Sequence, residues 1–147
     1  RDRSPSRGLG DVYKRQAWDL LNSVRTRAEA TSITEANYDE MMSVRKKTHN
    51  LTFIDDSTPE GKFRTVLYWE RGFELAFEGQ RKYDLIRWGV LGKALKLFGE
   101  ISSVNQKENK PYPAYRNFTE GKHELFPIPL KEIQSNPKLN GMNNNGY

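Results

Sequence analysis

The chain has 147 residues, of which 35% are hydrophobic, 12% aromatic and 29% charged. This composition is typical of one folded domain with a core, and it excludes a mainly disordered chain. There is no cysteine, which excludes disulfide bridges and thiolate metal sites, and no apolar run approaches the roughly 20 residues of a membrane span. The formal net charge of +5 suggests nucleic-acid binding as one hypothesis.

The first sixteen residues are basic and show no hydrophobic period. Their last six read DVYKRQ, which is also the translation of the end of a transposase adaptor used in sequencing libraries. We therefore predict that residues 1–16 are a non-native, disordered leader, and a genuine disordered basic tail is the alternative. This segment has five Lys or Arg against two Asp, so residues 17–147 have a charge of only +2. The nucleic-acid hypothesis is weaker without it.

Three helices are predicted in the first half of the remaining chain. Apolar residues recur at helical spacing between Ala17 and Ala30. Thr34 is a suitable N-cap for a second helix of about a dozen residues. After a short linker, Thr58 and Pro59 predict the start of a third helix, with proline at its first position.

The most informative stretch runs from residue 63 to residue 92. Its first part is apolar nearly all round, which is typical of a helix buried in a core. Glu70, Glu74 and Glu78 recur at i, i+4 and i+8, so they form one stripe of carboxylates along that helix. Buried carboxylates need partners. We therefore predict that Glu74 and Glu78 are buried in ion pairs with arginines.

Arginines in the same stretch can supply these partners, and Arg81 and Arg87 are the leading candidates. Gly79 is predicted to end the helix in a left-handed cap, and a second helical turn follows it. The predicted structural ion-pair network consists of Glu70, Arg71, Glu74, Glu78, Arg81, Asp84 and Arg87.

Beyond residue 92 a helix is predicted over residues 93–98, with Gly99 as its end. Residues 101–124 then read as a long polar loop, and loops of this length tend to be functional or disordered. Three aromatic residues of this loop are weak candidates for ligand binding, as a platform on which sugars stack; the alternative is that they attach the loop to the core. These residues are Tyr112, Tyr115 and Phe118.

Three phrases of the sequence resemble those of the SusD/RagB family. Residues 70–89, ERGFELAFEGQRKYDLIRWG, are similar to its signature, except that Gly72 stands where the family usually has arginine. Residues 21–28, LNSVRTRA, and residues 125–147, LFPIPLKEIQSNPKLNGMNNNGY, also fit. The last phrase departs at Asn145, where the family usually has proline. The resemblance covers nearly all of residues 17–147.

The resemblance implies a mainly α fold, with tetratricopeptide-like helix pairs and long loops, of which residues 17–147 would be the C-terminal part. It implies an outer-membrane lipoprotein that is exposed on the cell surface. Such a protein binds an oligosaccharide or a peptide and delivers it to a SusC-like TonB-dependent transporter. The membrane would be contacted only through a lipid anchor on a part absent from this sequence.

The residues themselves indicate no catalytic site, metal site or cofactor. No histidine follows Glu70, Glu74 or Glu78 at the i+3 spacing of two-iron bundles. Glu74 and Glu78 have a spacing suitable for a glycosidase, but the predicted burial of their helix would exclude substrate. We therefore expect a binding protein that is not an enzyme. The open alternatives are a helical protein–protein interaction scaffold without a nutrient role and, more weakly, a nucleic-acid binder.

Overall fold

The computed structural model describes residues 11–105 and 113–147. The described residues form helices and no strand, which confirms the prediction of a mainly α fold. The chain divides into two compact units, Arg1–Glu78 and Gly79–Tyr147.

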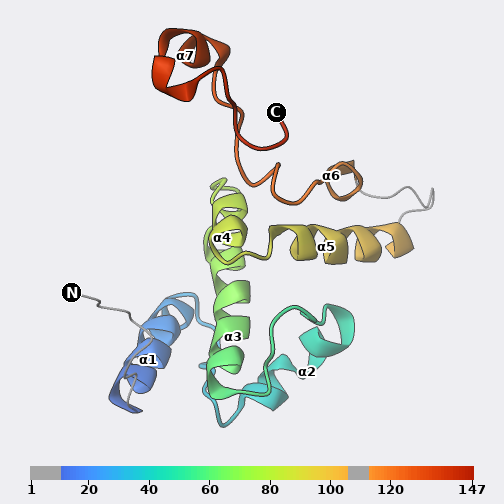
Figure 1. The fold of residues 1–147 in the computed structure, drawn as a ribbon. Helices are drawn as coiled ribbons and strands as arrows, with labels where there is room; N and C mark the ends of the chain where they lie inside the picture. Colours follow the sequence, from blue (N-terminus) through green and yellow to red (C-terminus); the bar gives the residue numbers. More distant parts are fainter. Residues whose placement is uncertain (1–10, 106–112) are drawn as a thin grey trace. The chain divides into compact units, whose positions relative to one another are not determined.

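Three helices make up the described part of the first unit (Figure 1). They are α1 (Asp11–Arg27), α2 (Tyr38–Thr48) and α3 (Pro59–Glu74). All three supply side chains to one core, together with the segment between α1 and α2. The buried residues of this core are Leu21, Ile33, Tyr38, Met42 and Val66.

Aromatic side chains close this core at its edge. Trp18 of α1 and Phe63 of α3 meet edge to face, with ring centroids 5.0 Å apart. Both are partly buried against the core. Edge-to-face pairs of this kind add stabilisation beyond the area they bury. The contact fixes α1 beside the first turns of α3.

The first helix begins earlier than the sequence predicts. Residues 11–16, which we assigned to a disordered leader, form the first turns of α1. The helix is continuous from there to Arg27, so disorder is the wrong prediction for these six residues. The assignment of residues 1–16 to a non-native leader stays a prediction, and residues 1–10 lie outside the described part of the chain.

The third helix starts as predicted and ends earlier. The hydroxyl of Thr58 accepts a hydrogen bond from the backbone N–H of Gly61 at 3.0 Å, and Pro59 occupies the first turn. The helix was predicted to continue to Gly79, but it ends at Glu74. Beyond it Phe77 adopts a left-handed backbone with a φ of 67° and is fully exposed. A helix end without packed apolar side chains has little to stabilise it.

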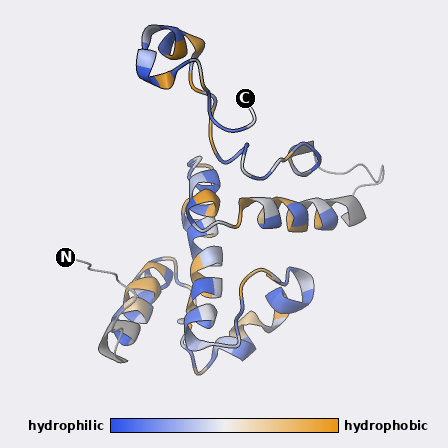
Figure 2. Cartoon of the chain, in the orientation of Figure 1, coloured by the Kyte–Doolittle hydropathy of each residue, from blue (hydrophilic) through white to orange (hydrophobic). Residues whose placement is uncertain are grey.

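The described part of the second unit contains four helices, of which α5 is the longest, and a 3-10 turn (Figure 1). Hydrophobic and hydrophilic residues alternate along α5, as expected of a helix covered on one face (Figure 2). The elements are α4 (Arg81–Arg87), α5 (Leu91–Asn105), α6 (Pro113–Arg116), α7 (Leu130–Ser135) and η1 (Pro137–Leu139).

The end of the chain is fastened to the proline-rich segment before α7 by side-chain amides. Asn143 Oδ1 accepts a hydrogen bond from the N–H of Ile128 at 2.7 Å, and its Nδ2 donates to the carbonyl of Ile128 at 3.4 Å. Asn144 Nδ2 donates to the carbonyl of Phe126 at 2.7 Å. Proline lacks the N–H that a regular strand pairing needs. The asparagines therefore replace a backbone ladder between these two segments.

Candidate functional site

The predicted carboxylate stripe is held by arginines of α1. Glu70 forms an ion pair with Arg25, and the two side chains are only 16% and 10% exposed. Arg25 also donates from Nε to the carbonyl of Thr31 at 2.7 Å. One guanidinium therefore joins α3 to both α1 and the segment that follows it. Hydrogen bonds between charged groups are among the stronger contacts in a fold.

The other two carboxylates are less buried than predicted. Glu74 pairs with Arg27, and these side chains are 40% and 68% exposed. Glu78 lies beyond the end of α3 and is exposed. The prediction that Glu74 and Glu78 are buried is therefore wrong, because α3 stops before the stripe is complete. The partner of Glu74 comes from α1.

The remaining members of the predicted network lie in different places. Arg87 pairs with the buried Asp84 at 2.9 Å, within α4. The guanidinium of Arg81 lies 6.0 Å from the ring centre of Trp88. Arg71 is half-buried on α3. The structure thus pairs Glu70 and Glu74 with arginines of α1 and Asp84 with Arg87, and the network of all seven residues stays a prediction.

Arg25 and Arg27 are the partners that the sequence analysis missed. Both belong to LNSVRTRA, which we had interpreted as part of an amphipathic helix and as a family phrase, without a role in ion pairing. A signal was available, because Arg25 follows Leu21 by four residues and so shares its buried face. A charged residue at a core position of a helix needs an acidic partner. The stripe in α3 supplies it.

Arg45 of α2 covers the aromatic surface beside this ion pair. Its guanidinium carbon lies 5.2 Å from the ring centre of Trp69 and 4.4 Å from that of Phe73. The two rings stack with centroids 6.1 Å apart. Burial lowers the pKa of Arg45, the nearby Glu70 raises it, and Arg25 lowers it. Stacking on rings is a role that arginine fills better than lysine.

A second polar cluster connects α2 with the linker before α3. The hydroxyl of Tyr38, which is fully buried, donates to Asp56 at 2.6 Å. Lys46 pairs with Asp56 at 2.8 Å and with Asp39 at 3.1 Å. Hydrogen bonds from Lys46 and then from Tyr38 lower the pKa of Asp56. Burial first, and then the bond to Asp56, raise the pKa of Tyr38.

Two of the three aromatic ligand-binding candidates, Tyr115 and Phe118, lie against α5. Tyr115 packs over Gly99 so closely that a Cβ atom there would be 2.9 Å from its Cδ1. Phe118 lies against Gly92, where a Cβ would be 2.7 Å from its Cε1. Both side chains are half-buried, the arrangement expected of residues that attach the loop to the core. Tyr112 lies outside the described residues, and ligand binding by any of the three stays a prediction.

The prediction that Gly99 ends its helix is wrong. The helix α5 continues through it to Asn105. Glycine in a helix costs about 1 kcal/mol relative to alanine, so a packing reason is needed to explain it there. The ring of Tyr115 supplies that reason.

We expect Gly99→Ala to lower the free energy of unfolding by about 1 kcal/mol. Overpacking costs about 1–3 kcal/mol, and the gain in helix propensity offsets about 1 kcal/mol of it. Denaturant titration of the chain measures the change. In a Tyr115→Ala background the same substitution should be neutral or stabilising. Equal stabilisation by Gly99→Ala in both backgrounds would show that Tyr115 does not pack there.

A small cavity lies in the first unit, between α2 and α3. Its lining includes Lys46, His49 and Thr65, and its volume is about 10 Å³. This is room for roughly one water molecule. A sugar ring does not fit. Among the described residues no three His, Asp or Glu side chains gather in a geometry that could hold a metal ion.

The two sequence phrases that meet in the first unit, LNSVRTRA and ERGFELAFEG, are joined by Arg25 and Glu70. The sequence model described as the SusD family matches residues 9–147. The chain belongs to the SusD family. This match confirms the resemblance seen in the sequence and begins within the segment that we interpreted as a leader.

Two curated SusD-like proteins of Formosa agariphila (strain DSM 15362 / KCTC 12365 / LMG 23005 / KMM 3901 / M-2Alg 35-1) are similar to this SusD-family chain. SusD-like protein P25 is 39% identical over 87 residues, which cover 58% of this chain and 15% of the relative. SusD-like protein P2 is 34% identical over 94 residues, which cover 64% of this chain and 16% of the relative. The matches thus take in about a sixth of the length of these relatives. No solved structure matches the chain significantly.

The described helices of this SusD-family chain include none that is both long and apolar enough to cross a membrane.

Proposed function

We propose that this chain is the C-terminal part of a SusD-family protein that binds a nutrient, an oligosaccharide in the first instance, at the cell surface. The bound nutrient is then delivered to a SusC-like TonB-dependent transporter of the outer membrane. The whole protein is held at the membrane by a lipid anchor located outside this sequence. It binds its ligand without cleaving it, and it needs no cofactor.

The match of the SusD family model to residues 9–147 is the observation that carries this proposal. The geometry of the first unit supports it, because Arg25 and Glu70 bring two separate family phrases into one ion pair. In this proposal Arg25 and Glu70 serve architecture. The nutrient itself is held mainly by parts of the protein that precede this chain.

We expect the intact protein, tagged at its chromosomal gene, to be found in the outer-membrane fraction and to copurify with one large barrel transporter. Deleting the gene should abolish growth on one oligosaccharide and leave growth on its monosaccharide unchanged. Protease added to intact cells should degrade the protein, whereas a periplasmic marker should remain intact. Growth unchanged on every glycan, with copurification of soluble proteins in place of a transporter, would favour the scaffold alternative. Purified protein should release no sugar from the oligosaccharide it binds.

A further inference from the structure

The net positive charge of the chain comes from its second unit, because the first unit is neutral as a whole. Residues 79–147 have eleven Lys or Arg and six Asp or Glu, which gives a formal charge of +5. Residues 1–78 have thirteen of each and are neutral. The potential that attracts an anionic ligand therefore belongs to the second unit.

Two lysines of this unit lie over exposed aromatic rings. Lys82 Nζ lies 4.2 Å from the ring centre of Phe126, and Lys122 Nζ lies 4.7 Å from that of Tyr147. The two aromatic residues are 61% and 45% exposed. Ammonium groups and exposed aromatic residues thus occur together in this unit. We refer to these four residues as the lysine–aromatic surface.

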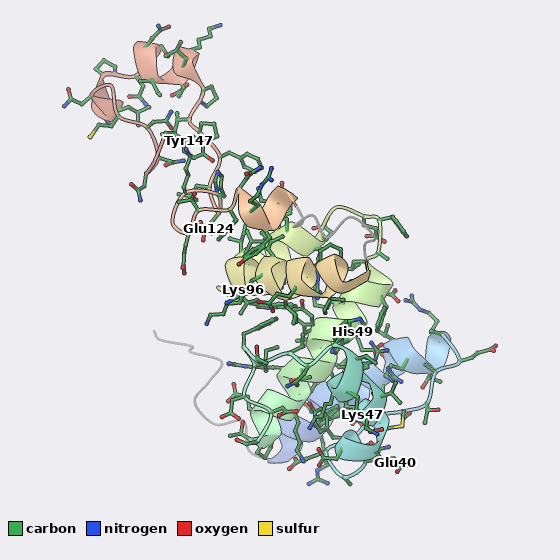
Figure 3. All side chains as sticks on the ribbon, turned by 90° about the vertical axis from the view of Figure 1, so that its right-hand side faces the viewer. Glu40, Lys47, His49, Lys96, Glu124 and Tyr147 are labelled. Carbon is green, nitrogen blue, oxygen red and sulfur yellow. The ribbon has the colours of Figure 1, made fainter. Side chains whose placement is uncertain are left out.

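Hydrogen bonds join the two segments of the chain that carry these rings. Tyr147 donates from its hydroxyl to the carbonyl of Leu125 at 3.1 Å, and Phe126 accepts from Asn144 at 2.7 Å. Both bonds join the end of the chain to the residues before α7, where Figure 3 places Tyr147. These hydrogen bonds hold the side chain of Tyr147 and the backbone at Phe126 within the second unit.

No carboxylate of the described residues neutralises the ammonium groups of this surface. Within the described residues, neither Lys82 nor Lys122 lies within 4.0 Å of a carboxylate oxygen. The acidic residues closest to Lys122 in sequence are Glu120, which is exposed, and Glu124, which is half-buried. A cation over a ring keeps its charge and remains able to bind an anion.

We propose that the lysine–aromatic surface binds an anionic oligosaccharide, one that carries carboxylate or sulfate groups. Ammonium groups attract such anions, and aromatic rings pack against the apolar faces of sugar rings. This combination favours a charged glycan over a neutral one and over a simple anion. The inference rests on the proposed function, since it names the class of nutrient.

The test compares two hexasaccharides of equal length, one of galacturonate and one of neutral glucose, titrated into the 147-residue chain and followed by NMR. We expect the galacturonate hexamer to bind at least tenfold more tightly, and added salt to remove the difference. The double variant Lys82→Gln, Lys122→Gln should weaken binding of the charged hexamer about tenfold, since two exposed ion pairs of ordinary strength together correspond to about that factor.

The matched control is Lys47→Gln, Lys138→Gln, which removes the same charge at two exposed positions outside the surface. It should leave binding within twofold of the parent. An equal loss in both double variants would show that only net charge matters, and absence of binding to the charged hexamer would overturn the inference outright. The inference would also be overturned if the neutral hexamer bound as tightly as the charged hexamer and still bound to the Lys82→Gln, Lys122→Gln variant. That result would leave the proposed nutrient-binding function standing.

Discussion

Replacing Arg25 by alanine should lower the free energy of unfolding of this chain by about 3–5 kcal/mol. Removing one partner of a buried ion pair leaves the other charge desolvated and unpaired, and the side chain of Glu70 is only 16% exposed. Arg25→Ala also removes the hydrogen bond to the carbonyl of Thr31. A whole domain has roughly 5–15 kcal/mol of stability, so this loss would be a large part of the total.

Two matched variants separate this effect from the general loss of an arginine or a glutamate. Arg27→Ala breaks a pair whose side chains are 68% and 40% exposed, and should cost less than about 1 kcal/mol. Glu78→Ala, at an exposed position, should change stability by no more than about 0.5 kcal/mol. Chemical denaturation followed by circular dichroism measures all three.

A double-mutant cycle with Glu70→Gln completes the test. If Arg25 and Glu70 act through each other, the two substitutions together should cost clearly less than the sum of their separate effects. Additive losses, or a parent-like midpoint for Arg25→Ala, would contradict the assignment of this pair as the main electrostatic link between α1 and α3.

Replacing Tyr38 by alanine should have an effect of similar size, about 3–5 kcal/mol. The side chain is fully buried in the core of the first unit, beside Met42 and Val66. Truncation would leave a cavity and would remove the hydroxyl that donates a hydrogen bond to Asp56 at 2.6 Å. Tyr38→Phe keeps the ring and should cost only about 1.5–3 kcal/mol, the usual range for a hydrogen bond to a charged group.

The pH dependence of this variant gives an independent check. The pKa of Tyr38 is raised in the fold, so above pH 10.0, its ordinary value, the folded chain keeps a proton that the unfolded chain has lost. The contribution of the hydroxyl is therefore complete below about pH 10 and declines as the pH rises further. The stability difference between parent and Tyr38→Phe should shrink over that range. Tyr83→Phe, at a position that is 57% exposed, is the control and should show no such change.

The amino-acid sequence by itself determined the fold class, the family and the helix starts that have a local cause. Thr58 and Pro59 begin α3 because an N-cap hydroxyl and a proline at the first position act within one turn. Apolar periodicity likewise marks α1, α2 and α3 as helices, because it reports which face of a helix is buried. The family phrases are read directly from residue order and need no coordinates.

Tertiary structure alone decided where helices end and which charges meet. Gly99 looks like a helix stop in sequence, but Tyr115, sixteen positions later, packs over it and the helix continues. Glu70 finds Arg25, which is 45 residues away, and not the arginines that follow it closely. Local spacing cannot rank partners that are distant in the chain, because the free energy of an ion pair depends on burial and on the approach of two helices. Those quantities exist only once α1 and α3 have packed around Tyr38 and Val66.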